Sequence, residues 1–176
     1  MNRDEWFQCE KVSLMLNYLW SKHNEDSLIP VLHQYYLRCA RNIEILLPQR
    51  ESIRGIEIGE DFLEGKIDEE KLSSENWAVE GAAFRIEYDT EPKKIRGWVK
   101  GLDSLEKSKL EKVLFGVDVS ELDMRELLID AAYFVDHAMI FPNCSPKNTV
   151  SDSYVKFLST DILRDILNDP EKTPNK

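Results

Sequence analysis

Between residues 28 and 47 the apolar side chains recur with the period of an α-helix, and this feature constrains the fold most strongly. At 100° per residue, Gln34, Arg38 and Arg41 fall on one side of the predicted helix. The apolar residues share a broad arc on the other side: Leu28, Leu32, Tyr35, Tyr36, Cys39, Ala40, Ile43, Leu46 and Leu47. A helix with so wide an apolar arc needs other elements to cover it, so the sequence predicts a packed helical array.

The same spacing recurs along most of the remaining chain. Further helices are predicted in the ranges 3–20 (as two short helices), 51–63, 68–88, 105–115, 120–141 and 154–167. We therefore expect an all-α fold, a single-domain array of about six to eight helices at 1–168, followed by a flexible C-terminal tail at 169–176. An α+β alternative stays open, because Phe84, Ile86 and Tyr88 also alternate and a small hairpin could form around 84–99.

Short polar side chains mark where the predicted helices begin. Asp26 or Ser27 is expected to cap the helix at 28–47, Asp68 the helix at 68–88, and Ser120 or Asp123 the helix at 120–141. Within the helix at 51–63, Gly55 and Gly59 lie in the middle of the apolar arc. Glycine costs about 1 kcal/mol in a helix, so this pair predicts the close approach of another backbone.

Charge separates the classes of partner that the chain is expected to bind. Lys plus Arg number 23 and Asp plus Glu number 33, which gives a formal net charge of −10. Such a surface repels nucleic-acid phosphates and anionic lipid, so we expect neither nucleic-acid nor membrane binding. It attracts a basic protein instead. No run approaches the roughly 18 apolar residues of a membrane span.

The cysteines and the N-terminal residues point to the cytoplasm. Three cysteines, Cys9, Cys39 and Cys144, make an odd and sparse set typical of a reducing compartment. The first residues precede no long apolar run, so no signal peptide is expected.

Catalytic and cofactor motifs are missing from the sequence. It contains no phosphate loop, dinucleotide-binding glycine pattern, nucleophile elbow, His-Glu-x-x-His or Cys-x-x-Cys. No cofactor or metal is therefore expected. Cys39 and His33 share one predicted helix, but six residues separate them by about 9 Å of rise with a large rotation. We expect Cys39 to be an inert core residue.

Glu60 is the carboxylate whose position is most informative. It falls at the rim of the apolar arc of its helix, where a carboxylate needs a cation or a hydrogen-bond donor. Arg38, Arg41 and Arg54 are the candidate partners. A structural ion pair between packed helices is the main interpretation, and a functional carboxylate is the other.

Two further stripes are candidate binding features. Trp77, Gly81, Phe84 and Tyr88 form one stripe, which is more typical of core than of a ligand pocket. Apolar residues on a second stripe of the same helix predict that this helix is central. The other candidate is a polar stripe on the helix at 120–141, formed by Glu126, Asp130, Tyr133 and His137, which is more typical of a solvated face than of an ion or acid–base site.

Several short motifs resemble those of an uncharacterised helical bacterial family that occurs as many paralogues. The opening Glu5-Trp6 with Met15-Leu16 and Tyr18-Leu19 resembles that family's Glu-Trp-Leu … Met-Leu-x-Phe-Leu. The segment 37–48 is similar to its Cys-Cys-Arg-Arg-x-Trp-x-Leu-Leu block, although the family's tryptophan is Glu44 or Ile45 here.

Two later segments extend the resemblance. Residues 52–65 are similar to the family's Ser-Arg-x-Ala-Val-Glu-x-Ala-Glu-x-x-x-x-Gly helix, and 161–166 to its terminal Leu-Leu-Arg-Asp-Ile-Phe. The matches cover about the first 70 residues and the C-terminus. None is a catalytic motif and the family has no established activity, so the resemblance implies a helical fold alone.

These observations favour a non-enzymatic, acidic protein-binding or regulatory module, for example an immunity-type inhibitor of a basic toxin. Its candidate binding residues are Arg38, Arg41, Glu60, Trp77, Asp130 and His137. The alternative is a small helical enzyme or ligand-binding protein with its site near Glu60 or His137. The sequence leaves the oligomeric state open.

Overall fold

The computed structural model describes residues 1–88, 93, 96–97, 100, 110, 112–114, 123–143, 151–168 and 170. Within these residues the chain forms seven α-helices and no strand, which confirms the all-α fold. The α-helices are α1 (Arg3–Gln8), α2 (Val12–Lys22), α3 (Glu25–Asn42), α4 (Arg50–Leu63), α5 (Glu69–Glu87), α8 (Met124–Met139) and α9 (Thr160–Ile166). Short 3₁₀ turns lie between the helices, at η1 (Glu44–Leu46), η3 (Phe141–Asn143) and η4 (Asp152–Phe157).

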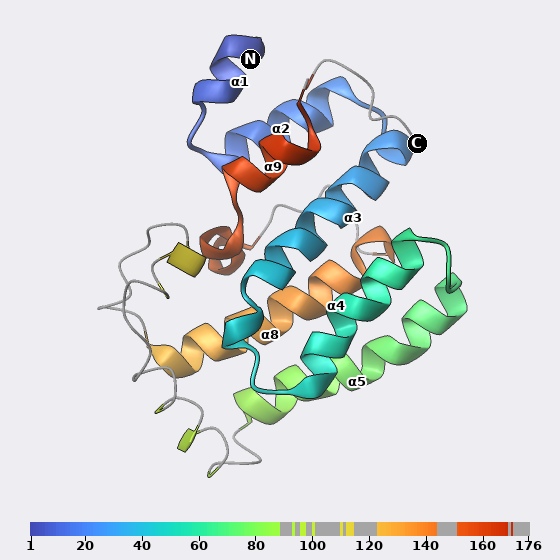
Figure 1. Ribbon diagram of the computed structural model, residues 1–176, viewed down its shortest axis with the longest axis vertical. Coiled ribbons are helices and arrows are strands. Elements are labelled where there is room, and N and C mark those ends of the chain that lie inside the picture. Colours follow the sequence, from blue (N-terminus) through green and yellow to red (C-terminus); the bar gives the residue numbers. More distant parts are fainter. Residues whose placement is uncertain are drawn as a thin grey trace.

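Helices α3 and α8 hold the array together. Helix α3 packs against α2, α4, α8 and α9, and α8 packs against α3, α4, α5 and η4. Figure 1 shows α1, α2 and α9 gathered at one end of α3, with α4, α5 and α8 side by side at the other. No helix in the described part of the chain is long and apolar enough to cross a bilayer.

The ends of the helices follow local chemistry, with one difference from expectation. Asp68 caps α5 and Asp123 caps α8 through their side chains, as predicted. The cap of α3 is Asn24, which accepts from the backbone N–H of Ser27, so α3 begins earlier than predicted. Consequently Pro30 lies inside α3, where it cannot donate the usual backbone hydrogen bond.

Helix α5 corrects two expectations. Residues 84–87 are helical, so the first strand of the alternative hairpin is not formed; most of 89–99 lies outside the described residues. The prediction of a central helix was also wrong. Helix α5 lies at the edge of the array, where it contacts α4 and α8. It therefore buries one face, formed by Leu72, Val79, Ala82, Ala83 and Ile86.

The two glycines of α4 make room for side chains of two different helices. A Cβ atom at Gly59 would lie 2.6 Å from Leu37 Cδ2 of α3, and one at Gly55 would lie 2.9 Å from Val79 Cγ2 of α5. A neighbour therefore lies close to each glycine, but the predicted approach of another backbone was wrong. The close contact involves a side chain from each of two neighbours instead of a single backbone.

The predicted helix at 105–115 lies largely outside the described residues, and so does most of the tail at 169–176. Leu110 and Leu114, which are described, are buried in the core cluster.

Candidate functional site

Arg41 and Glu60 join α3 to α4, and this is the pairing that the position of Glu60 predicted. Arg41 Nη2 lies 2.5 Å from Glu60 Oε2, and Arg41 Nε lies 3.3 Å from Glu60 Oε1, so the contact is bidentate. Arg41 Nη1 also donates to Glu44 Oε2 at 2.9 Å. The hydrogen bond to Glu60 is the main reason why the pKa of Arg41 is raised. The side chains are 38–41% exposed, so this network lies at the rim of the helix contact.

The other two candidate arginines go elsewhere. Arg38 Nη2 bonds Asp165 Oδ2 at 2.6 Å and connects α3 to α9. Arg54 Nε lies 3.5 Å from Glu75 Oε2 and connects α4 to α5. The three arginines thus serve three different helix contacts and do not converge on Glu60.

The residues of the polar stripe on α8 also contact different partners and do not form one site. Asp130 Oδ2 accepts from Lys156 Nζ at 2.5 Å. The ring of His137 lies 5.6 Å from the ring of Tyr154. Much of the His137 side chain is exposed, although the surrounding atoms exclude enough water to lower its pKa. Among the described residues, no three His, Cys, Asp or Glu side chains are grouped to hold a metal.

Asp136 is a buried carboxylate that the sequence reasoning missed. Its side chain is 8% exposed, and its Oδ1 accepts from Asn76 Nδ2 of α5 at 2.5 Å. Burial raises its pKa to about 6, the Asn76 bond works in the opposite direction, and the nearby charge of Glu80 adds to the increase. The signal was available, because Asp136 stands at the edge of the α8 apolar arc, as Glu60 does on α4.

The stripe of aromatic residues on α5 is exposed, which contradicts the expectation of core. Trp77 is 77% exposed, Phe84 40% and Tyr88 67%. With Gly81 between them, these three side chains follow one another along the outer side of α5; we call Trp77, Gly81, Phe84 and Tyr88 the aromatic row. The helical period predicted for α5 is correct, but spacing alone cannot show which of its two apolar stripes faces the protein interior.

Carboxylates border the aromatic row on the side that faces α8. Glu80 lies three residues from Trp77 and is near enough to Asp136 to affect its pKa. Glu87 Oε2 accepts from Tyr133 Oη, and Phe84 packs edge-to-face on Tyr133 with ring centroids 6.0 Å apart. The α5–α8 boundary therefore combines exposed aromatic rings with carboxylates, and we treat it as the candidate binding face.

The only cysteine–histidine combination that the sequence raised is buried and inert. Cys39 is fully buried, and burial raises the pKa of its thiol to about 12, so the thiol stays protonated. His33 is also fully buried, and desolvation lowers its pKa to about 4. Its Nε2 lies 3.1 Å from the carbonyl oxygen of Met139 and its ring packs between Phe62 and Phe141.

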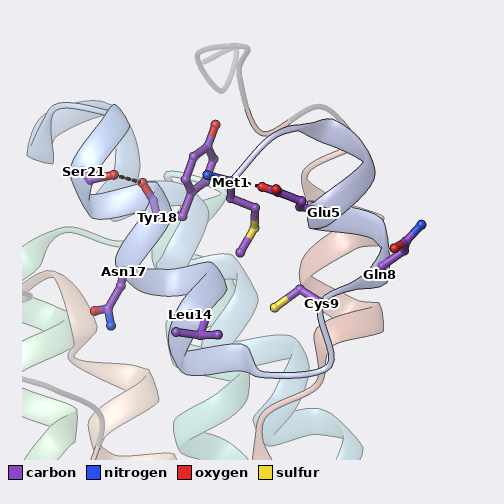
Figure 2. Close-up of a pocket in the computed structure, with 8 residues that line it drawn as sticks. All are labelled: Met1, Glu5, Gln8, Cys9, Leu14, Asn17, Tyr18 and Ser21. Atoms are coloured by element: carbon purple, nitrogen blue, oxygen red, sulfur yellow. Dashed lines mark hydrogen bonds and ion pairs between the residues drawn. The ribbon is translucent and has the colours of Figure 1, made fainter.

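An open groove of about 640 Å³ lies between α1 and α2 (Figure 2). Leu14, 51% exposed, and Tyr18 line one side, while Glu5 and Cys9 come from α1 and the turn that follows it. Cys9 Sγ lies 3.5 Å from the carbonyl oxygen of Lys11. The N-terminal nitrogen of Met1 lies 3.7 Å from Glu5 Oε2, and the other lining residues are uncharged.

Comparison of the chain with protein families, with curated proteins and with solved structures found no match.

Proposed function

We propose that this chain is a non-enzymatic binding or regulatory protein of the cytoplasm, and that its partner is a basic protein. An immunity-type inhibitor of a basic toxin is the form of this function that best fits so acidic a chain. The observation that carries the proposal is the formal net charge of −10. A field of that sign attracts a cationic protein and repels nucleic acid and anionic lipid.

The local chemistry supports binding over catalysis. The thiol of Cys39 and the ring of His33 are buried and held in their neutral forms. The carboxylate of Glu60 is already occupied by Arg41. By contrast, aromatic side chains of α5 stand in solvent beside carboxylates, and aromatic residues are the ones enriched in the centres of protein interfaces.

Affinity capture followed by kinetics tests the proposal. The protein is used as bait, the captured proteins are identified by mass spectrometry, and association with the purified partner is followed from about 0.02 to 0.5 M salt. We expect a basic partner whose association slows clearly, because the screening length falls to a few ångströms. An association rate that does not change with salt, or tight binding to duplex DNA at physiological salt, would contradict the proposal.

A ligand site beside Asp136 is the second candidate. It differs from the predicted alternative near Glu60 or His137, because Asp136 contacts Asn76 of α5, whereas His137 packs on Tyr154. The raised pKa of Asp136, about 6, favours it, because carboxylates shifted in this way occur often in functional sites. Native mass spectrometry of the purified protein separates the two proposals. A small molecule retained by the wild type and lost in Asp136→Asn would support the ligand site.

A further inference from the structure

The aromatic row of α5 is an exposed apolar strip that holds three of the exposed large hydrophobic side chains of the described residues. Trp77, Phe84 and Tyr88 differ in exposure from the residues on the inner face of α5, such as Val79 and Ala83, which are at most 2% exposed. The row lies on the helix at the edge of the array, and no helix of the described chain covers it. Exposed aromatic residues in a row are typical of surfaces that bind another protein.

Gly81 leaves open space in the middle of the row. A Cβ atom there would meet only Arg85 Nη1, at 3.8 Å. Trp77 and Phe84 are seven residues apart, so about 10 Å of helix separates them, and the Arg85 guanidinium lies beside Gly81 in that interval. The same guanidinium donates its Nη2 to Glu51 Oε1 of α4 at 2.7 Å, so this cation is already paired with a carboxylate of the chain.

Carboxylates give this surface a negative charge. Glu80 stands next to Trp77 on the α8 side, and it forms no ion pair with any described residue. Exposed Glu70, seven residues before Trp77, continues the row, and Asp136 with its Asn76 bond lies behind Glu80. The nearest cation on the α8 side, Arg125, donates its Nη2 to the carbonyl oxygens of Ile86 and Glu87, at the end of α5.

We infer that the aromatic row, with Glu70 and Glu80 beside it, is the docking surface for an arginine-containing segment of a basic partner protein. This inference rests on the proposed function and adds the place and the chemistry of recognition. A guanidinium group is planar, stacks on aromatic faces and donates to carboxylates at its edge, so it matches both components of the surface.

An exposed apolar strip could also bind a second copy of the chain, but the negative charge of this surface argues against self-association. Two copies meeting through this face would bring Glu70 and Glu80 of each toward like charges. A cationic segment instead removes the repulsion that Glu80 exerts on Asp136.

The test uses the whole protein and a nonaarginine peptide, with a nonacitrulline peptide as the neutral control of similar shape. Affinity is measured by calorimetry at about 0.02 M salt, and the site is mapped by amide chemical-shift changes. We expect saturable binding of nonaarginine with shifts concentrated at 73–88 and 126–137, and no binding of nonacitrulline. Trp77→Ala should weaken binding about tenfold, because a stacked cation is lost.

Matched variants separate local contact from general charge. Glu80→Gln and Glu57→Gln remove the same charge from neighbouring helices, and Glu57 is exposed on α4. We expect Glu80→Gln to weaken binding several-fold more than Glu57→Gln. Leu14→Ala removes an exposed apolar side chain from α2 and should leave affinity unchanged. Trp77 is 77% exposed, so its loss should leave the fold intact, which melting curves verify.

The outcomes distinguish this inference from the proposed function. Binding that maps to another face, or that Trp77→Ala leaves unchanged, overturns the docking surface and leaves the basic partner standing. Absence of saturable nonaarginine binding overturns both. Sedimentation that shows a wild-type dimer, with Trp77→Ala monomeric, overturns the inference in favour of self-association.

Discussion

His33 and Asp136 are both buried, and burial acts on their protonation in opposite directions. For His33 the folded pKa is about 4, below its ordinary value of 6.5. For Asp136 the folded pKa is about 6, above its ordinary value of 3.8. Between about pH 4 and 6 the unfolded chain binds more protons at His33, whereas the folded protein binds more at Asp136. One residue therefore favours unfolding on acidification and the other opposes it.

His33→Gln should flatten the acid-induced loss of stability. Each pKa unit corresponds to about 1.4 kcal/mol, so the wild-type histidine lowers the free energy of unfolding by about 3 kcal/mol as pH falls from 6.5 to 4. The variant will be less stable at neutral pH, because the bond to the Met139 carbonyl is altered, but its stability should rise on acidification through Asp136. Urea unfolding at pH 7.5, 6.0 and 4.5 measures this. Parallel pH profiles for variant and wild type would show that the imidazole is not kept neutral.

Asp136→Asn should have the opposite effect. At pH 7 the buried carboxylate is charged at a cost of about 3 kcal/mol, which an amide avoids while still accepting from Asn76. We expect the variant to be more stable at pH 7 by up to about that amount and to lose stability steeply below pH 6.5. The same urea series decides it. A variant less stable than wild type at pH 7 would mean that the charge is compensated.

Glu60→Ala tests the ion pair at the rim of the α3–α4 contact. Position alone suggested a cost of about 1–3 kcal/mol, but the pair is about 40% exposed and solvent weakens it. We expect a loss of about 1 kcal/mol or less, which reflects the bidentate geometry. Glu57→Ala, also on α4, should change stability by no more than about 0.5 kcal/mol. Thermal melts compare them, and equal melting temperatures would refute a stabilising role for the pair.

At the scale of elements, the glycines of α4 set how closely α3 and α5 approach it. Gly59→Ala would place its new methyl group 2.6, 3.1 and 3.4 Å from three carbons of the buried Leu37 side chain. Rotation of the new methyl group does not move its carbon atom, so it cannot relieve these three contacts. We expect a net loss of about 1–2 kcal/mol, despite the gain of about 1 kcal/mol from replacing glycine in a helix.

Gly81→Ala is the matched control, because it has the same helix-propensity gain and no clash. Its nearest atom would be Arg85 Nη1 at 3.8 Å. We expect a gain of up to about 1 kcal/mol. Chemical denaturation of both variants gives the comparison. If both were stabilised, the core around Leu37 would be looser than its burial indicates.

The elements also show where sequence reasoning reaches its limit. Periodicity located α3, α4, α5 and α8, because a buried arc imposes its spacing on the sequence. It placed Glu60 at the rim of its arc and predicted a cationic partner, and Arg41 is the one of the three candidate arginines that bonds it. It could not orient α5, whose two apolar stripes are equivalent until neighbours are known. It could not supply the partner of Asp136, because Asn76 lies sixty residues away in the sequence.

At the scale of the molecule, stability should fall from the centre of the array outward. Amides of α3 and α8, which contact most other helices, should exchange with solvent only through global unfolding. Helix α1 has six residues and one buried side chain, Trp6, so it should open locally at lower cost. Native-state hydrogen exchange in dilute denaturant measures both. Equal opening free energies for α1 and α3 would show a single cooperative unit.

The contrast between Trp6 and Trp77 gives the molecule two optical reporters. Trp6 is 0% exposed and Trp77 is 77% exposed, so their indole emission begins from opposite environments. Unfolding brings Trp6 into water and moves its emission to longer wavelength, whereas a partner that covers Trp77 moves the emission of that residue to shorter wavelength. In a variant that keeps only these two of the four tryptophans, fluorescence therefore separates denaturation from complex formation by the direction of the shift.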